Sequence, residues 1–148
     1  MNAYLLERLS KLTGFVYNVA IDVRPDPPAP ALGLTIHQPH ASLIVLGIKD
    51  VENRSWRTRH RGPLLIHAGK DIDQHALDRY GHLLADPDDL PRGVLLGTVD
   101  LVDVVTDSTS PWADPTCFHW ILVNPRLLAR PIPCRGDRGL WPVASAVL

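Results

Sequence analysis

The strongest limit on the fold comes from residues 93–105, a β-type run whose apolar side chains fall on both faces of the strand. A strand that is apolar on both faces needs cover on each side, here a helix and the interior of a curled sheet or barrel. Further short strands are predicted at residues 32–36, 50–58, 63–68, 116–123 and 140–143. Because these runs do not alternate regularly with helices, the pattern predicts an α+β fold built on a small curled sheet or barrel of five to six strands.

Two short helices are expected to flank these strands. The first spans residues 39–46, where Pro39 occupies the first turn and Gly47 is placed to end the helix. The second is expected to begin at Asp71, with Gln74 three residues later as a capping box. Its predicted apolar stripe consists of Ile72, Ala76, Tyr80 and Leu83.

Four prolines within residues 24–30 divide the chain into two parts. Such a stretch lacks backbone donors and cannot sustain a helix or a central strand, so we interpret it as a linker. The residues before it have the apolar spacing of an amphipathic helix, which Gly14 weakens. The expected organisation is an N-terminal helical arm with a Pro-rich linker over residues 1–30, followed by one domain over residues 31–148. The arm is interpreted as a packing element through which a homodimer would form.

Composition narrows the class of protein. The chain has 148 residues, 45% of them hydrophobic, and a formal net charge of −1, which is typical of a single-core domain. Charged residues interrupt every apolar run before the ~18 residues that a membrane-spanning helix needs, so no membrane segment is expected. Cys117 and Cys134 lack zinc-site spacing, and the start of the chain lacks a secretory signal pattern. We therefore expect a cytoplasmic protein without metal or cofactor.

Charge is unevenly distributed along the chain. Residues 49–70 contain six lysines and arginines against two acidic residues, whereas residues 71–114 contain ten aspartates against two arginines. A basic stretch inside a nearly neutral chain favours a local anion site over a protein that coats nucleic acid non-specifically.

The densest polar constellation lies on the predicted strand 50–58. Residues two apart on a strand share a face, so Glu52, Arg54 and Trp56 are expected to project together. An indole that stacks, beside charged groups that bond to a ring edge, would recognise a flat polar ring. The alternative is a surface ion pair between Glu52 and Arg54 with Trp56 packed beneath it.

Other candidate site residues allow two interpretations each. Arg57, Arg59 and Arg61 alternate along the chain, which suits contact with a phosphate backbone or simply a solvated strand end. His67 is either a hydrogen-bonded core residue or part of the site, and Trp141 is either packed or at the edge of a cleft.

Several separated blocks resemble the ASCH domain family, which is related to the PUA-like RNA-binding fold. The blocks that carry the resemblance are LTIHQPHASLIVLGIK at 34–49, VENRSW at 51–56, RGPLLIHA at 61–68, GTVDLVD at 97–103, FHWILVNP at 118–125 and GLW at 139–141. The resemblance implies a PUA-like β-barrel with a cleft between the first helix and the barrel. RNA or a modified nucleoside would bind in that cleft.

The resemblance also identifies a candidate reactive residue, Lys49, two positions after Gly47. Family members that hydrolyse N4-acylcytidine place a threonine three residues after this lysine, and here the position is Glu52. A glutamate there favours charged lysine and makes it a poorer base, so threonine-dependent hydrolysis is not expected. In a regular strand Lys49 and Glu52 would point to opposite faces, so joint action requires Lys49 to lie in a turn after Gly47.

These observations lead to one predicted function and two alternatives. The first is binding of RNA or a modified nucleoside by Lys49, Glu52, Arg54, Trp56, Arg59, His67 and Trp141. The second is a metal-independent hydrolase, an N4-acylcytidine amidohydrolase or a ribonuclease, with Lys49 and Glu52 as catalytic residues. The third is a protein-interaction module that uses the N-terminal arm.

Overall fold

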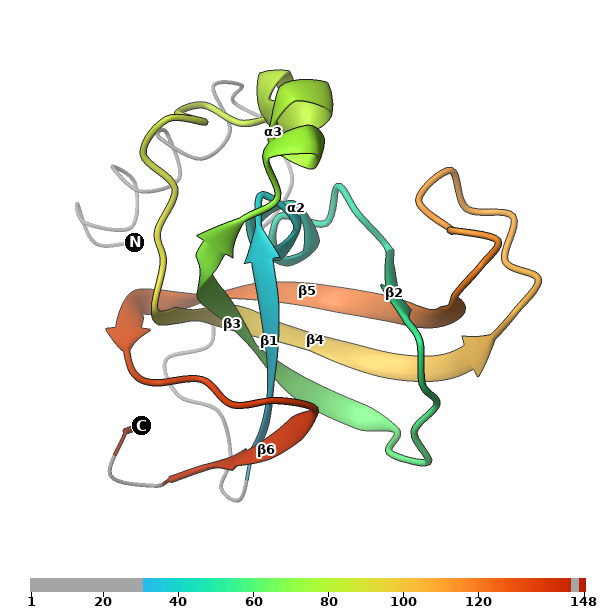
Figure 1. Ribbon diagram of the computed structural model, residues 1–148. Coiled ribbons are helices and arrows are strands. Elements are labelled where there is room, and N and C mark those ends of the chain that lie inside the picture. Colours follow the sequence, from blue (N-terminus) through green and yellow to red (C-terminus); the bar gives the residue numbers. More distant parts are fainter. Residues whose placement is uncertain (1–30, 145–146) are drawn as a thin grey trace.

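The computed structural model describes residues 31–144 and 147–148 and shows one curled six-stranded sheet with short helices at one end (Figure 1). The strands are β1 (Ala31–Gln38), β2 (Val51–Arg54), β3 (Gly62–Ile72), β4 (Val94–Val105), β5 (Phe118–Pro133) and β6 (Leu140–Val143). Their order in the sheet is β2-β5-β4-β3-β1-β6. Only β1 and β3 pair in parallel, and the other neighbours are antiparallel. The predicted α+β class is confirmed.

The sheet is not closed, so the predicted barrel is wrong. Within the described residues, β2 and β6 form the two ends of the sheet and do not pair with each other. β6 pairs with residues 31–34 of β1, which leaves the same edge of β1 without a strand partner from Thr35 to Gln38. β2 ends after four residues at Arg54. The ring of backbone hydrogen bonds therefore stops short, and the facing edges of β1 and β2 are not paired with each other among the described residues. We call this interruption of the backbone pairing the opening between β1 and β2.

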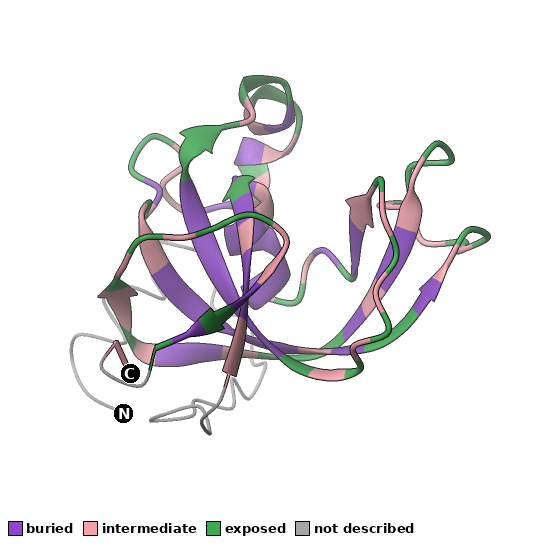
Figure 2. Cartoon of the chain, turned by 60° about the horizontal axis from the view of Figure 1, so that its bottom comes forward, coloured by how far each residue is buried: buried purple, intermediate pink, exposed green. Residues whose placement is uncertain are grey.

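The helix α2 (His40–Val45) packs against the inside of the curled sheet, and all its residues after His40 are buried. It contacts β1, β3, β4 and β5, and its side chains join a core that includes Leu34, Ile66 and Trp120. Figure 2 shows buried residues along the strands and exposed residues gathered in the connecting loops. This core holds the segment after α2 in a fixed position beside the opening.

The second helix, α3 (Gln74–Tyr80), is followed by a single 3₁₀ turn, η1 (Gly81–Leu83). Its N-cap is Asp73, whose carboxylate accepts a hydrogen bond from the Ala76 N–H at 2.9 Å, so the capping box predicted at Asp71 is wrong. Asp71 still belongs to β3, because that strand extends to Ile72. Ala76 is the buried residue of α3.

The strand β5 is twice as long as the sequence predicts. Asn124 has a positive φ of 52°, and two residues, 124 and 125, stand opposite one residue of β4 between the paired positions. A bulge of this kind lets a strand bend and continue through a proline. The strand therefore runs on to Pro133.

The predicted N-terminal arm, the linker and the dimer contact all fall on residues 1–30, outside the described residues. In the part that the structure describes, no helix is long and apolar enough to cross a membrane.

Candidate functional site

Lys49 lies where the predicted joint action with Glu52 requires it, in the turn that follows α2. Gly47 has a φ of +75°, a conformation that glycine adopts without strain. The N–H groups of Ile48 and Lys49 then both donate to the carbonyl of Leu43, at 2.9 and 3.0 Å. This turn directs the Lys49 side chain toward β2.

Three of the predicted site residues meet in the opening between β1 and β2. The Lys49 ammonium lies 3.1 Å from Glu52 Oε2, and Arg54 Nε lies 3.2 Å from Glu52 Oε1. Arg54 also donates through Nη2 to the carbonyl of Thr35 at 2.8 Å. Arg54 therefore bridges from β2 to the edge of β1 that no strand covers, and a side chain spans the place where a closed barrel would have backbone hydrogen bonds.

Two residues that the sequence analysis did not single out complete this arrangement. His40 Nδ1 lies 3.0 Å from the Lys49 ammonium, and His40 Nε2 lies 3.2 Å from Asp73 Oδ2. Since an ammonium only donates, Nδ1 accepts and Nε2–H donates to the carboxylate. We call the five residues Asp73, His40, Lys49, Glu52 and Arg54 the mouth cluster. The available sequence signal was a histidine in the first turn of a helix that ends just before Lys49.

Two members of this cluster, His40 and Asp73, have a lowered pKa, for different reasons. Desolvation, with the Lys49 ammonium adding to it, holds the pKa of His40 below its usual value, although Glu52 and Asp73 act against the shift. The hydrogen bond from the Ala76 N–H, helped by His40, lowers the pKa of Asp73. His40 is therefore neutral near pH 7 and serves as an acceptor for the lysine.

The cluster is buried at its centre and exposed at its ends. The side chains of Lys49 and Glu52 are 4% and 9% exposed, whereas those of His40, Arg54 and Asp73 are 22%, 21% and 41% exposed. The cavity that Lys49 itself lines has a volume of about 60 Å³, enough for a few water molecules and too small for a nucleobase. A ligand would first meet Asp73, His40 and Arg54.

Trp56 lies beyond the end of β2, because that strand ends at Arg54 and the strand alternation does not extend to residue 56. Its ring packs edge-to-face on Trp120, with centroids 4.7 Å apart, and its carbonyl accepts a hydrogen bond from the Trp120 indole at 3.2 Å. Trp56 is partly buried against the core.

The arginines of the predicted strand end lie instead in the loop between β2 and β3, residues 57–61, which we call the arginine loop. Arg57 stands over the Phe118 ring at 5.3 Å, and Arg61 pairs with Asp103 at 3.4 Å. A hollow of about 610 Å³ is lined by Arg57, Thr58, Arg59 and Arg61, so three guanidinium groups border it.

His67 and Trp141 are brought together on the other face of β1, away from Lys49. His67 pairs with Thr35 in the sheet, and its Nε2 donates to the carbonyl of Cys134 at 3.0 Å. The Trp141 indole donates to Thr35 Oγ1 at 3.2 Å and stands edge-on to His67 with centroids 5.7 Å apart. The predicted seven residues thus fall into separate groups, of which Lys49, Glu52 and Arg54 form one.

Comparison with known proteins identifies the family of this chain. A family model described as the ASCH domain matches residues 34–130. Activating signal cointegrator 1 of Mus musculus is 35% identical over 77% of this chain, and so is the Homo sapiens protein of the same name. The chain covers 22% of the length of each of these relatives. The matched region contains the mouth cluster and the arginine loop, and the chain belongs to the ASCH domain family.

Proposed function

We propose that this domain binds RNA or a modified nucleoside at the opening between β1 and β2. The observation that carries the proposal is the mouth cluster, in which Lys49, Glu52 and Arg54 converge from two segments at a sheet edge without a strand partner. Its accessible groups are Asp73, His40 and Arg54. Arg54 offers a hydrogen-bond donor, and the His40 ring can donate or accept depending on its protonation, to an incoming base or phosphate.

The arginine loop supports nucleic acid as the ligand. This loop follows β2 in the chain. The hollow bordered by Arg57, Arg59 and Arg61 is therefore formed by the residues that come soon after Arg54. Guanidinium groups bind phosphate oxygens in bidentate fashion. An RNA strand whose phosphate backbone follows this loop would bring one of its bases toward the mouth cluster. The relation of the ASCH family to the PUA-like RNA-binding fold supports the same assignment.

Titration of short single-stranded RNAs and free modified nucleosides against the full chain tests this function. Arg59→Ala should weaken RNA binding uniformly across sequences and reduce the slope of log affinity against log salt by about one unit. Lys49→Met, which keeps the length of the side chain, should weaken both ligands. Arg79→Ala, an exposed arginine on α3, serves as the matched control. Unchanged titrations in both site variants would refute the proposal.

The same incubation decides between binding and hydrolysis. The contacts from Asp73 through His40 to Lys49 favour an enzyme as the second candidate. They connect the lysine to side chains that can accept or donate a proton. Mass spectrometry of N4-acetylcytidine and RNA after incubation, with and without chelator, would reveal a product. A product that disappears with Lys49→Met would establish a metal-independent hydrolase, and retention without conversion would establish a reader.

A protein-interaction module remains the third candidate. The two relatives are named signal cointegrators, a name that describes those longer proteins. Truncation before Ala31, followed by measurement of the oligomeric state, tests whether the N-terminal arm joins two copies of this chain.

A further inference from the structure

A second hollow lies on the face of β1 and β3 that carries His67 and Trp141, and the proposed function does not use it. Its volume is about 1060 Å³, and it is the larger of the hollows described here. The segment between β5 and β6, residues 134–138, passes over this face, and we call it the strap. The strap and the two strands form the walls of what we call the outer hollow.

The strap rests directly on the sheet at Gly136. A Cβ atom at this position would lie 2.5 Å from both His67 Nδ1 and Thr35 Oγ1, so any larger residue would push the strap outward. Cys134 holds the start of the strap, since its carbonyl accepts from His67 Nε2 and its N–H donates to the Gly93 carbonyl at 3.1 Å. The strap is therefore anchored at Cys134 and lies against His67 and Thr35 at Gly136.

The floor of the outer hollow contains an unsatisfied acceptor. His67 is 3% exposed, and its Nδ1 is buried without a hydrogen-bond partner among the described residues. Because Nε2–H donates to Cys134, Nδ1 carries a lone pair. Burial lowers the pKa of His67, although the bond to Cys134 opposes the shift. A buried acceptor without a donor is unfavourable. Because the strap lies over Nδ1 at Gly136, a hydroxyl or amino group of a ligand would reach this acceptor as the strap shifts outward.

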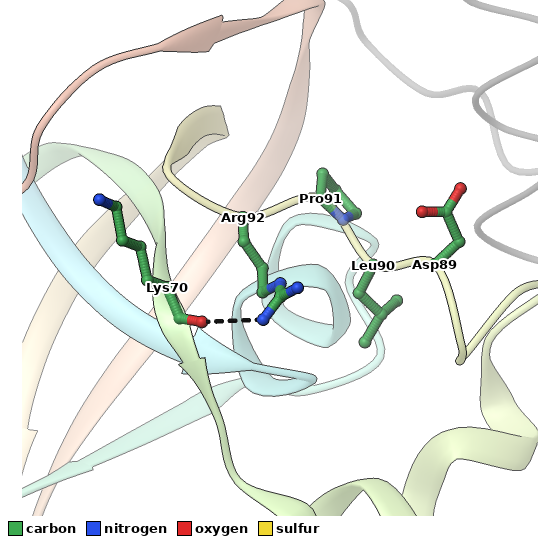
Figure 3. Close-up of a pocket in the computed structure, with 5 residues that line it drawn as sticks. All are labelled: Lys70, Asp89, Leu90, Pro91 and Arg92. Carbon is green, nitrogen blue, oxygen red and sulfur yellow. Dashed lines mark hydrogen bonds between the residues drawn. The ribbon is translucent and has the colours of Figure 1, made fainter.

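The rim of the outer hollow is basic with two carboxylates between the cations. Lys70, Arg135 and Arg138 line it together with Asp71 and Asp137. Figure 3 shows the Lys70 side chain directed away from Arg92, whose guanidinium is bound to the Lys70 carbonyl at 3.2 Å. A rim with one excess positive charge suits one phosphate group accompanied by hydrogen-bond donors better than a long polyanion.

We propose that the outer hollow binds a nucleotide, with its phosphate at Arg135 and Arg138 and a hydroxyl or amino group directed to His67 Nδ1. The nucleotide is either free or part of an RNA strand, and the chemistry recognised is the same. This site is separate from the mouth cluster, although Thr35 touches both, through its carbonyl to Arg54 and its side chain to the hollow.

Calorimetric titration of the full chain with cytidine 5′-monophosphate, cytidine and inorganic phosphate tests the site. The monophosphate should bind at least about tenfold more tightly than either fragment, and Arg135→Ala/Arg138→Ala should weaken it by about tenfold or more. Both arginines are exposed, so the double variant should fold. Arg79→Ala should leave this binding unchanged. The double variant alters no residue of the mouth cluster or the arginine loop, which separates this result from the proposed function.

A spectroscopic readout checks the role of His67. The ¹⁵N resonance of Nδ1 should shift on addition of cytidine 5′-monophosphate and stay in place with phosphate alone. Absence of binding to the unmodified chain, equal binding by the double variant, or equal binding of phosphate alone would overturn the proposal. A decameric RNA distinguishes the sources: weaker binding by the double variant assigns the nucleotide to a strand, and unchanged RNA binding assigns it to a free nucleotide.

Discussion

Glu52→Gln is the substitution that tests the mouth cluster most directly. It keeps the shape of the side chain and removes the charge shared by Lys49 at 3.1 Å and Arg54 at 3.2 Å. With an effective dielectric of about 20, each contact corresponds to about 5 kcal/mol of Coulomb attraction. Desolvation offsets much of this, and Arg54 reaches solvent. Because Lys49 would remain buried without a carboxylate, we expect a net loss of about 3–5 kcal/mol in the free energy of unfolding.

Urea unfolding followed by tryptophan fluorescence measures this loss, since Trp120 is fully buried and Trp141 nearly so. The matched control is Asp103→Asn, which breaks the pair with Arg61, where both side chains are largely exposed. That control should cost no more than about 1 kcal/mol. If Glu52→Gln cost as little as the control, the argument from buried charge would be refuted.

A double-mutant cycle separates the ion pair from general packing. In the Glu52→Gln background, Lys49→Met removes the cation that lacks a carboxylate, so it should cost less than in the original chain or even stabilise it. We expect a coupling free energy of about 1–3 kcal/mol. Strictly additive effects would mean that the two side chains contribute independently.

Three further outcomes follow from the same contacts. The pKa values of His40 and His67 are lowered in the folded chain, so the unfolded chain binds more protons. The free energy of unfolding should therefore fall as the pH drops below about 6.5. His40→Gln should make this dependence on pH less steep, as measured by urea titrations at several pH values. Asp73→Ala should cost about 1 kcal/mol through loss of the α3 cap, measured by urea unfolding. Gly97→Ala should cost at least about 3 kcal/mol or prevent folding, detectable by circular dichroism, because its Cβ would collide with the Arg126 carbonyl.

Sequence patterns located the strands well where the signal is local. The predicted strand 140–143 has the observed bounds, and the long run at 93–105 differs from β4 by one residue. The requirement that Lys49 lie in a turn after Gly47 was also local, because a glycine with positive φ turns the chain after α2. The ion pair with Glu52, three residues later in the chain, follows from that turn.

Features that depend on distant segments could not be predicted in this way. The contact of His40 with Asp73 joins residues 33 positions apart, and it forms only because α2 and the start of α3 dock at the same end of the sheet. Barrel closure likewise depends on whether the edges of two strands come close enough to pair. The periodicity of apolar residues carries no information about that distance. The placement of Trp56 beside Glu52 and Arg54 stays a prediction, since the alternation behind it was extended past the point where β2 ends.

The open sheet and the candidate site have a common explanation in Arg54. Two paired strand edges would close the barrel with backbone hydrogen bonds, and a ligand cannot replace those without unfolding the edge. Here the contact across the opening is a guanidinium that binds the Thr35 carbonyl and Glu52. A ligand phosphate or base can compete for such a group because the exposed part of an ion pair contributes little net free energy. In the proposed binding mode, the buried pair of Lys49 with Glu52 would hold the two edges in place while Arg54 turned to a ligand.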